Sequence, residues 1–163
     1  MFYEVVKLLV LGILRCCFLL KVEGREHVPT AGPLILAANH TSFLDPPTVG
    51  ASTRRPLYYL AKAELFRIPL FGALIRRVNA RPVERGGNDA AALRLALRLL
   101  GEGKALLLFP EGTRGVEGGF GPAKAGTGML ALMSGAPVIP IYVRGTGVAL
   151  PRGRLVPRPA RLF

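Results

Sequence analysis

The sequence predicts a single α/β domain with a mostly parallel central sheet flanked by helices, preceded by an N-terminal amphipathic helix. Two observations support this fold class. Short apolar runs of strand length alternate along the chain with segments of helical periodicity, which is typical of βαβ units. The length of 163 residues also suits one domain with a sizeable core. We therefore expect a helix over residues 1–20 and one folded domain over residues 21–163.

The N-terminal segment, residues 1–20, is apolar and about long enough to cross a bilayer, but Glu4, Lys7 and Arg15 interrupt it. On a helix these charges fall in one sector, which they share with several apolar side chains. We therefore expect an amphipathic, membrane-associated helix that lies in the interface, with its charges reaching anionic headgroups. The alternative is an ordinary helix packed on the core.

The rest of the chain divides into alternating strands and helices. The predicted strands cover residues 21–24, 33–38, 57–61, 81–83, 105–109 and 138–143. The predicted helices cover residues 46–51, 70–77, 89–100 and 124–134. Asn88 and Gly101 are suitable residues to begin and end the third of these helices. Pro140 indicates either an edge strand or a bend. The tail, residues 145–163, is rich in Arg, Pro and Gly and predicts a loop.

The composition favours an anionic membrane surface as a partner. The chain has 22 Lys and Arg against 10 Asp and Glu, a net charge of +12, together with a mean hydropathy of +0.37. No acidic residue follows Glu117. A nucleic-acid-binding protein would also be basic, but the sequence shows no readout motif, so we expect no nucleic-acid partner. The two adjacent cysteines and two histidines argue against a structural metal site.

The stretch ANHTSFLD, residues 38–45, follows a run that predicts a buried strand. In open α/β sheets, sites form beyond the carboxyl ends of strands, which is where His40 stands. Histidine is a natural general base, and a carboxylate such as Asp45 fixes its tautomer and stabilises its protonated form. Positions five apart point in different directions on a helix, so the two side chains meet only across a turn. The alternative is that Asp45 caps the following helix, with Pro46 at its first position, or serves both roles.

A second candidate segment, FPEGTRG at residues 109–115, also follows a buried strand. Its Arg114 can clamp a phosphate bidentately, and Glu111 can hold that arginine or orient a substrate. The alternative is a loop with an internal Glu111–Arg114 ion pair. NARPVER predicts a short strand that ends at Arg85. Taken alone, an arginine after a strand is usually an ordinary surface residue. Neither a GxSxG elbow nor a P-loop is present, which disfavours the usual serine hydrolases and P-loop proteins.

Together these segments resemble the sequence blocks of glycerolipid acyltransferases, in particular the 1-acylglycerol-3-phosphate (lysophosphatidic acid) acyltransferases. NHTSFLD resembles their NHx4D box, and FPEGTRG closely matches their third block. NARPVER resembles the second block, which ends in a substrate-binding arginine, here Arg85, and VIPIYV resembles the proline-containing fourth block. The resemblance runs from about Leu20 to Leu150, and the combination of the first and third blocks is highly specific.

The resemblance implies that residues 21–163 are an acyltransferase domain. It would move a fatty acyl group from acyl-CoA or acyl carrier protein to the sn-2 hydroxyl of lysophosphatidic acid, giving phosphatidic acid for phospholipid biosynthesis. His40, oriented by Asp45, would deprotonate that hydroxyl without an acyl-enzyme intermediate. The implied substrate-binding residues are Arg85, Glu111, Gly112, Thr113 and Arg114. Cofactors other than the thioester co-substrate are not expected, and the expected location is the cytoplasmic face of the cell membrane.

Two departures and two alternatives accompany this resemblance. The second block begins with Asn79 where the family usually has glycine, which could alter the turn before Arg85. Family members commonly continue beyond the position of Phe163, so we expect either a minimal or a truncated C-terminal end.

One alternative function is acyl transfer to another lysolipid acceptor. The other is a catalytically inactive homologue that binds membranes, which the intact set of candidate residues disfavours.

Overall fold

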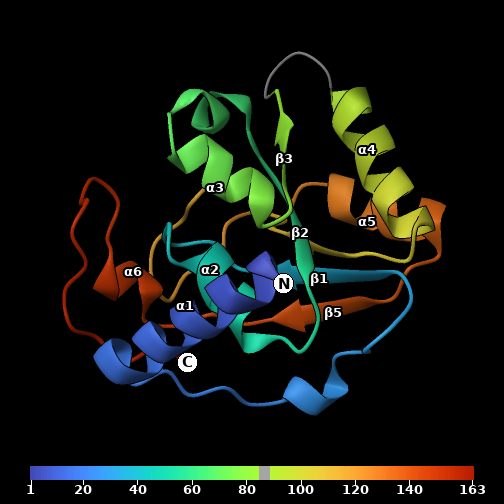
Figure 1. Cartoon of the computed structure of the whole chain (residues 1–163). Helices are drawn as coiled ribbons and strands as arrows, with labels where there is room; N and C mark the ends of the chain where they lie inside the picture. The colour runs from blue at the N-terminus through green and yellow to red at the C-terminus, as the bar shows by residue number, and fades with distance from the viewer. Residues whose placement is uncertain (85–88) are drawn as a thin grey trace.

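A five-stranded sheet forms the centre of the computed structural model, which describes residues 1–84 and 89–163 (Figure 1). Its strands are β1 (Leu34–Ala38), β2 (Leu57–Lys62), β3 (Ala80–Val83), β4 (Ala105–Leu108) and β5 (Val138–Ile141). Their order in the sheet is β3-β2-β4-β1-β5, and every neighbouring pair is parallel. The predicted α/β class with a parallel central sheet is therefore confirmed.

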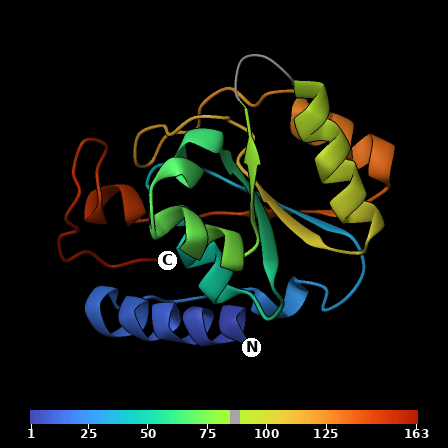
Figure 2. The same ribbon diagram turned by 45° about the horizontal axis from the view of Figure 1, so that its top comes forward.

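Helices cover both faces of the sheet. They are α1 (Phe2–Phe18), α2 (Asp45–Ser52), α3 (Phe71–Arg77), α4 (Asp89–Gly101), α5 (Gly126–Ser134) and α6 (Thr146–Ala149), with the 3-10 helices η1 (Arg25–His27) and η2 (Ala63–Arg67). Figure 2 shows α1 beneath α2 on one side of the sheet and α4 with α5 on the other. A layer on each face is the usual way in which parallel strands bury both of their surfaces.

Side-chain alternation along β1 divides the core in two. Leu34 and Leu36 pack in a cluster that includes Val49 of α2, whereas Ile35 packs in a cluster that includes Leu100 of α4. All three β1 residues are completely buried. Burial of an aliphatic side chain contributes roughly 1.5–3 kcal/mol, so both layers hold this strand in register and with it the segment that follows.

The last strand lies at the edge of the sheet, as Pro140 predicts. β5 pairs with β1 alone, and Pro140 is aligned with Ala37 in that pairing. Proline has no amide N–H to donate, which an edge strand tolerates because one of its sides has no neighbouring strand. Of the two alternatives, an edge strand or a bend, the edge strand is therefore confirmed.

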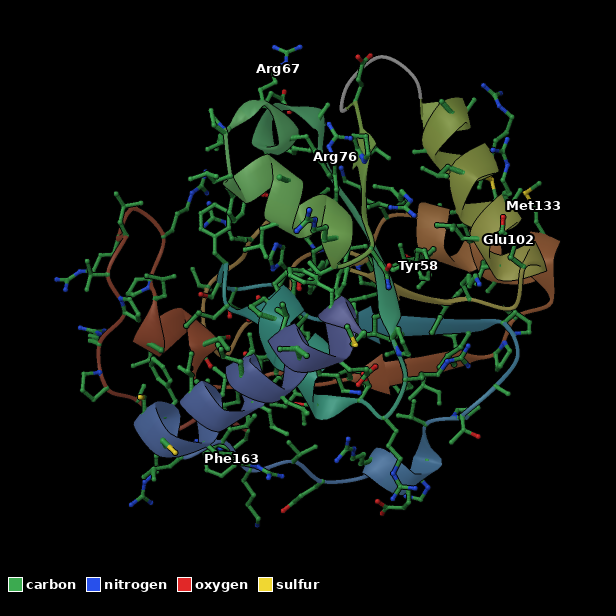
Figure 3. The ribbon with its side chains drawn as sticks, in the orientation of Figure 1. Tyr58, Arg67, Arg76, Glu102, Met133 and Phe163 are labelled. Atoms are coloured by element: carbon green, nitrogen blue, oxygen red, sulfur yellow. The ribbon has the colours of Figure 1, made fainter. Side chains whose placement is uncertain are left out.

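Two predictions for the chain around this edge are wrong. Residues 21–24 are not a strand, because Gly24 adopts φ +70° and the segment makes single backbone bonds, such as Lys21 N–H to the Leu162 carbonyl (3.0 Å). The tail is not all loop, since residues 146–149 form α6. Its end is also anchored: Leu162 is completely buried, and Phe163 exchanges two backbone bonds with Arg144. Figure 3 shows Phe163 near α1. The predicted cap Asn88 lies outside the described residues.

Helix α1 packs on the domain through the side that carries Lys7, whereas Glu4 and Arg15 are exposed. Lys7 is buried, and its Nζ donates to the Arg54 carbonyl and to Glu4 Oε2, each at 3.1 Å. Leu14 and Phe18 are buried on the same side. The expectation that Lys7 reaches toward headgroups is therefore wrong, because the domain itself supplies its partners. The opposite side, here called the outer apolar face of α1, consists of Val5, Leu8, Leu9 and Ile13, all exposed.

Among the described residues, no helix has both the length and the hydropathy that a bilayer crossing requires. The longest of them, α1, has 17 residues.

One glycine joins β5 to the tail and offers a test of this anchoring. Gly145 has φ +88°, and a Cβ there would overlap the Arg161 carbonyl; Gly153 has φ +89° with open space around it. An alanine in this conformation costs roughly 1–2 kcal/mol, so Gly153→Ala should lose about that much stability. Gly145→Ala should lose distinctly more, as measured by urea unfolding. Equal losses would show that the tail does not pack closely against Gly145.

Candidate active site

The first candidate loop leaves the carboxyl end of β1 and is held to the end of β5. Asn39 is buried, its Nδ2 donates to the Val143 carbonyl (2.8 Å), and its Oδ1 accepts from the Val143 N–H (2.7 Å). This amide therefore continues the sheet by one residue beyond β1. His40 follows at the edge of the sheet where ligand sites of open α/β folds form. The sequence reasoning missed Asn39, whose signal was a polar side chain between a buried strand and the candidate base.

His40 and Asp45 meet across a turn. His40 Nδ1 lies 2.8 Å from Asp45 Oδ2, which also accepts from the N–H groups of Thr41 (2.6 Å) and Ser42 (2.8 Å). Asp45 is completely buried. The helix α2 begins at Asp45, with Leu44 as its N-cap and no side-chain capping bond. The capping alternative is thus wrong, because this carboxylate binds the turn before the helix rather than the helix itself.

These contacts define which nitrogen of His40 can act as a base. Asp45 Oδ2 is an acceptor for two amide N–H groups, so Nδ1 of the ring donates to it and Nε2 keeps its lone pair. Nε2 has no hydrogen-bond partner among the described residues, and the side chain is 14% exposed. The ring stacks on Phe109 at 4.0 Å between centroids, with 21° between the planes. His40 is therefore held on two sides, with Nε2 available to a substrate.

Glu111, expected to bind substrate, instead lies behind His40. It is buried, its Oε1 accepts from the His40 amide N–H (3.2 Å), and its Oε2 accepts from the Gly121 N–H (3.0 Å). The Gly115 N–H in turn donates to the His40 carbonyl (2.8 Å). Glu111 therefore joins the loop after β4 to the loop after β1. The alternative of a Glu111–Arg114 ion pair is not observed among the described residues.

The rest of the FPEGTRG segment carries Arg114 to the same place as His40. Gly112, at φ +68°, donates its N–H to the Phe109 carbonyl (2.9 Å) and so closes a tight turn. The Arg114 guanidinium then lies 3.8 Å above the ring of Phe43. Burial, together with the nearby Arg152 charge, lowers the pKa of Arg114 from its ordinary value, and the Asp45 carboxylate partly offsets this. Arg85 lies outside the described residues.

A cavity of about 650 Å³ opens beside these groups. His40, Thr113 and Arg114 line it, whereas Glu111 and Gly112 do not. Most of the remaining lining residues are apolar and come from α1, α2, β2 and α3, among them Val6, Val10, Pro46, Pro47, Ala51, Leu60, Leu74 and Ile75. A predominantly apolar cavity with a few convergent polar groups is typical of a small-molecule or lipid site.

A hydrogen-bonded tyrosine pair forms part of the wall of this cavity. Tyr3 and Tyr59 approach to 3.3 Å between hydroxyl oxygens, and Tyr3 also accepts from the Leu57 N–H (2.9 Å). Burial raises the pKa of Tyr59 well above its ordinary range. A Cβ on Gly50 would overlap the Tyr59 hydroxyl, so any larger residue there would require the tyrosine pair to shift. Because Tyr3 belongs to α1, the N-terminal helix contributes directly to the cavity.

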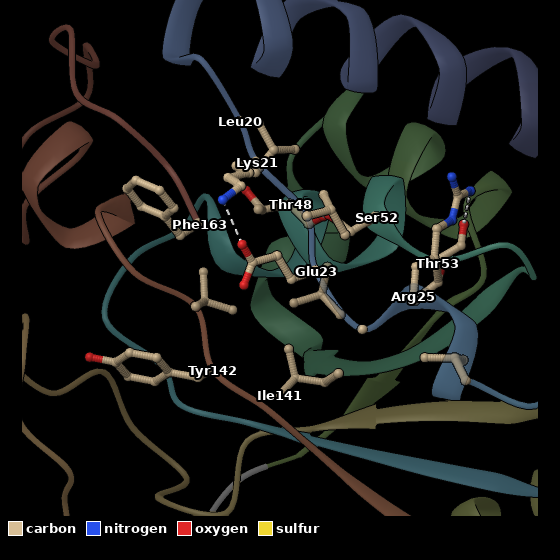
Figure 4. A pocket seen from close by; sticks show the side chains of 15 residues that line it. Leu20, Lys21, Glu23, Arg25, Thr48, Ser52, Thr53, Ile141, Tyr142 and Phe163 are labelled. Carbon is tan, nitrogen blue, oxygen red and sulfur yellow. Dashed lines mark hydrogen bonds and ion pairs between the residues drawn. The ribbon is translucent and has the colours of Figure 1, made fainter.

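A second cavity, of about 350 Å³, lies elsewhere in the molecule (Figure 4). It is lined by residues 20–25, one side of α2 and the end of β5, and it contains none of the predicted site residues. In the described part of the chain, no three His, Cys, Asp or Glu side chains gather in a way that could hold a metal ion.

The residues that sequence reasoning missed are those that complete the surroundings of His40. Phe43 and Phe109 supply the faces on which Arg114 and His40 lie. Arg152, from the tail, lines the same cavity. The aromatic residues stand within or beside the candidate motifs, but their stacking depends on the fold. The only sequence signal for Arg152 was the purely basic C-terminal part of the chain.

Comparisons with known proteins show the family to which the chain is similar. The acyltransferase family model matches residues 19–144. The chain is 33% identical over 135 residues to the chloroplastic 1-acyl-sn-glycerol-3-phosphate acyltransferase BAT2 of Brassica napus, covering 81% of this chain and 39% of that protein. It is 31% identical over 126 residues to the 1-acyl-sn-glycerol-3-phosphate acyltransferase of Bacillus subtilis, covering 77% of this chain and 62% of that protein.

A solved structure agrees over almost the whole chain. The crystal structure of the 1-acyl-sn-glycerophosphate (LPA) acyltransferase PlsC from Thermotoga maritima matches with a TM-score of 0.84 and 30% identity. The match covers 99% of this chain and 65% of that one, so the chain spans about two thirds of this structural relative. The family model matches well over half of the chain and includes both His40 and Arg114. The chain therefore belongs to the acyltransferase family.

Proposed function

We propose that the chain transfers a fatty acyl group from acyl-CoA or acyl carrier protein to the sn-2 hydroxyl of lysophosphatidic acid, giving phosphatidic acid. The observation that carries this proposal is the arrangement of His40, whose Nε2 is free while Nδ1 donates to the buried Asp45, at the wall of a large apolar cavity. The relatives named as 1-acyl-sn-glycerol-3-phosphate acyltransferases support this choice of acceptor. A phosphorylated lysolipid also combines an apolar chain with the charge that an arginine binds.

In the proposed reaction, His40 Nε2 accepts the proton of the acceptor hydroxyl as the oxygen attacks the thioester carbonyl. The tetrahedral intermediate then collapses, the carbon–sulfur bond breaks, and the imidazolium returns its proton to the thiolate. Asp45 stabilises the imidazolium in the interval through the 2.8 Å contact with Nδ1. The mechanism needs no acyl-enzyme intermediate, since the acceptor hydroxyl is itself the nucleophile.

The apolar cavity provides a place for a hydrocarbon chain. Its walls are formed by α1, α2, β2 and α3, and His40 lies at its polar part. Each methylene group that leaves water for such a cavity contributes about 0.8 kcal/mol, so a long chain bound there would be held firmly. The proposal assigns the phosphate of the acceptor to Arg114 and Arg85, and it assigns to Glu111 and Gly112 the shaping of the loop. A metal or redox cofactor has no role in it.

We further propose that the protein works at the cytoplasmic face of the cell membrane, with α1 lying in the interface. The outer apolar face of α1 supports this, because four large side chains are exposed there, including Leu8 at 64% and Leu9 at 60%. Arg15 is exposed on the same helix and can reach an anionic headgroup. The opposite side of α1 lines the proposed acyl cavity, so a lipid has a short path from the membrane to His40.

The first prediction from this proposal concerns the general base. His40→Ala should lower acyl transfer to lysophosphatidic acid by at least ~10²-fold, because positioned acid–base groups contribute that much or more. Transfer of a radiolabelled acyl group is measured with each donor in turn. His27→Ala is the control, because His27 is the other histidine and its side chain is 77% exposed. Near-normal turnover by His40→Ala would contradict the mechanism.

The second prediction concerns phosphate binding. Lysine keeps the charge of Arg114 but cannot reproduce its planar fork or its stacking on Phe43. Arg114→Lys should therefore raise the KM for lysophosphatidic acid roughly tenfold while leaving the KM for the thioester donor nearly unchanged. Arg98→Lys, on the exposed side of α4, is the control. A rise in the donor KM alone would move Arg114 to the donor site.

The third prediction concerns the membrane. Leu8→Asp should weaken sedimentation with vesicles of phosphatidylcholine and phosphatidylglycerol roughly tenfold, because a charge replaces an apolar group on the outer apolar face of α1. Leu132→Asp introduces the same charge at a residue of α5 that is 89% exposed and should bind vesicles like the unmodified protein. If both variants bind equally well, α1 is not the membrane contact.

A further inference from the structure

The residue that follows α6 is held close to the turn that carries His40. Ser42, two positions after His40, donates its hydroxyl to the Leu150 carbonyl (2.8 Å), and Leu150 is buried. The Leu150 N–H donates to the Thr146 carbonyl (2.8 Å), and the Arg158 N–H donates to the Ala149 carbonyl (2.8 Å). The tail therefore leaves α6 from a defined position beside the active-site loop.

Beyond Leu150 the tail makes a turn that separates two arginines. The Arg154 N–H donates to the Pro151 carbonyl (3.1 Å), which closes a four-residue turn with Gly153 at φ +89° in its third position. A positive φ at that position is what a type II turn requires. Arg152, at the second position, lines the cavity that holds His40, whereas Arg154, at the fourth position, does not. Both arginines are exposed, and the turn places only Arg152 at the wall of the cavity.

Arg152 and Arg114 bring two positive charges to the same part of the cavity. Both line it beside His40 and Thr113. Their charges interact, since Arg152 contributes to the lowered pKa of Arg114. Within the described residues, neither guanidinium has a carboxylate at ion-pair distance. The buried Asp45 carboxylate offsets only part of this repulsion, and a bound anion would reduce what remains.

We propose that Arg152 binds the phosphate monoester of the substrate together with Arg114. The proposal rests on the function proposed above, which supplies a phosphorylated acceptor. Two guanidinium groups offer several N–H donors and two charges, which suits a phosphate dianion better than a carboxylate or a neutral head group. Lysophosphatidic acid and the phosphates of acyl-CoA share this chemistry, and the experiment below separates them.

The test compares Arg152→Gln with Arg154→Gln, which removes the same charge from the fourth position of the same turn. With lysophosphatidic acid as acceptor, Arg152→Gln should raise its KM roughly tenfold or more, as expected for a lost charge-assisted bond. Arg154→Gln should stay within twofold of the unmodified protein. With monoacylglycerol, which has no phosphate, the two variants should be equally active. A purely structural role for Arg152 would instead impair the use of both acceptors.

A second measurement separates the two sources of phosphate. An acyl-N-acetylcysteamine donor, which has no phosphate, replaces acyl-CoA in the same assays. A tenfold effect that persists with this donor assigns Arg152 to the acceptor, and an effect that disappears with it assigns Arg152 to the donor's phosphate. An identical KM for both substrates in Arg152→Gln and Arg154→Gln would overturn the proposal.

A direct binding measurement tests this inference independently of the proposed reaction. In a His40→Ala background, lysophosphatidic acid binding to the Arg152→Gln and Arg154→Gln variants is measured directly by titration calorimetry. Weaker binding by Arg152→Gln alone supports the phosphate site even if the unmodified protein transfers no acyl group to this acceptor. Equal binding by both variants, with acyl transfer intact in the unmodified protein, refutes the Arg152 assignment and leaves the proposed function standing.

Discussion

The loop that presents His40 depends on one buried carboxylate. Asp45 Oδ2 accepts three hydrogen bonds, from the His40 ring and from the N–H groups of Thr41 and Ser42. A buried charge is tolerated only where such bonds replace those of water. The same bonds bend residues 41–44 into a turn, which brings a side chain five positions away back onto the imidazole. The Arg114 charge, which interacts favourably with Asp45, offsets part of the cost of burial.

Two further carboxylates connect the loops around this turn in the same manner. Glu111 binds the backbone N–H groups of His40 and Gly121, and Glu117 binds those of Gly145 (2.6 Å) and Gly147 (2.8 Å). These contacts join the loops after β1, β4 and β5 into one rim. The chain has only 10 acidic residues against 22 basic ones. Three of the ten bind backbone amides here, and within the described residues none lies at ion-pair distance from Arg114 or Arg152.

The sequence by itself determined the fold class and the approximate places of the five strands, and it located the candidate site segments. Continuous apolar runs of strand length predict strands that are buried on both faces. The runs at β1 and β4 predicted two such strands, and most of their residues are buried. Pro140 predicted an edge strand because proline lacks an amide donor, and β5 is at the edge. His40, Asp45 and Arg114 could be selected as candidates because polar residues directly after buried strands lie at the ligand-binding edge of a parallel sheet.

Only the tertiary structure decided which contacts these side chains make. Helical periodicity located the charged sector of α1 but not the groups that surround it. In the structure, Lys7 is buried and donates to the Arg54 carbonyl, and the outer apolar face of α1 is exposed. Glu111, expected to bind substrate, instead accepts from the His40 N–H, 71 positions away in sequence, and does not line the cavity. The sequence contains no signal for Arg152 beyond the basic character of the C-terminal part, because its place at the cavity follows from tertiary contacts of the tail such as the bond between Ser42 and Leu150. Contacts between residues far apart in sequence arise from packing, and no local pattern encodes them.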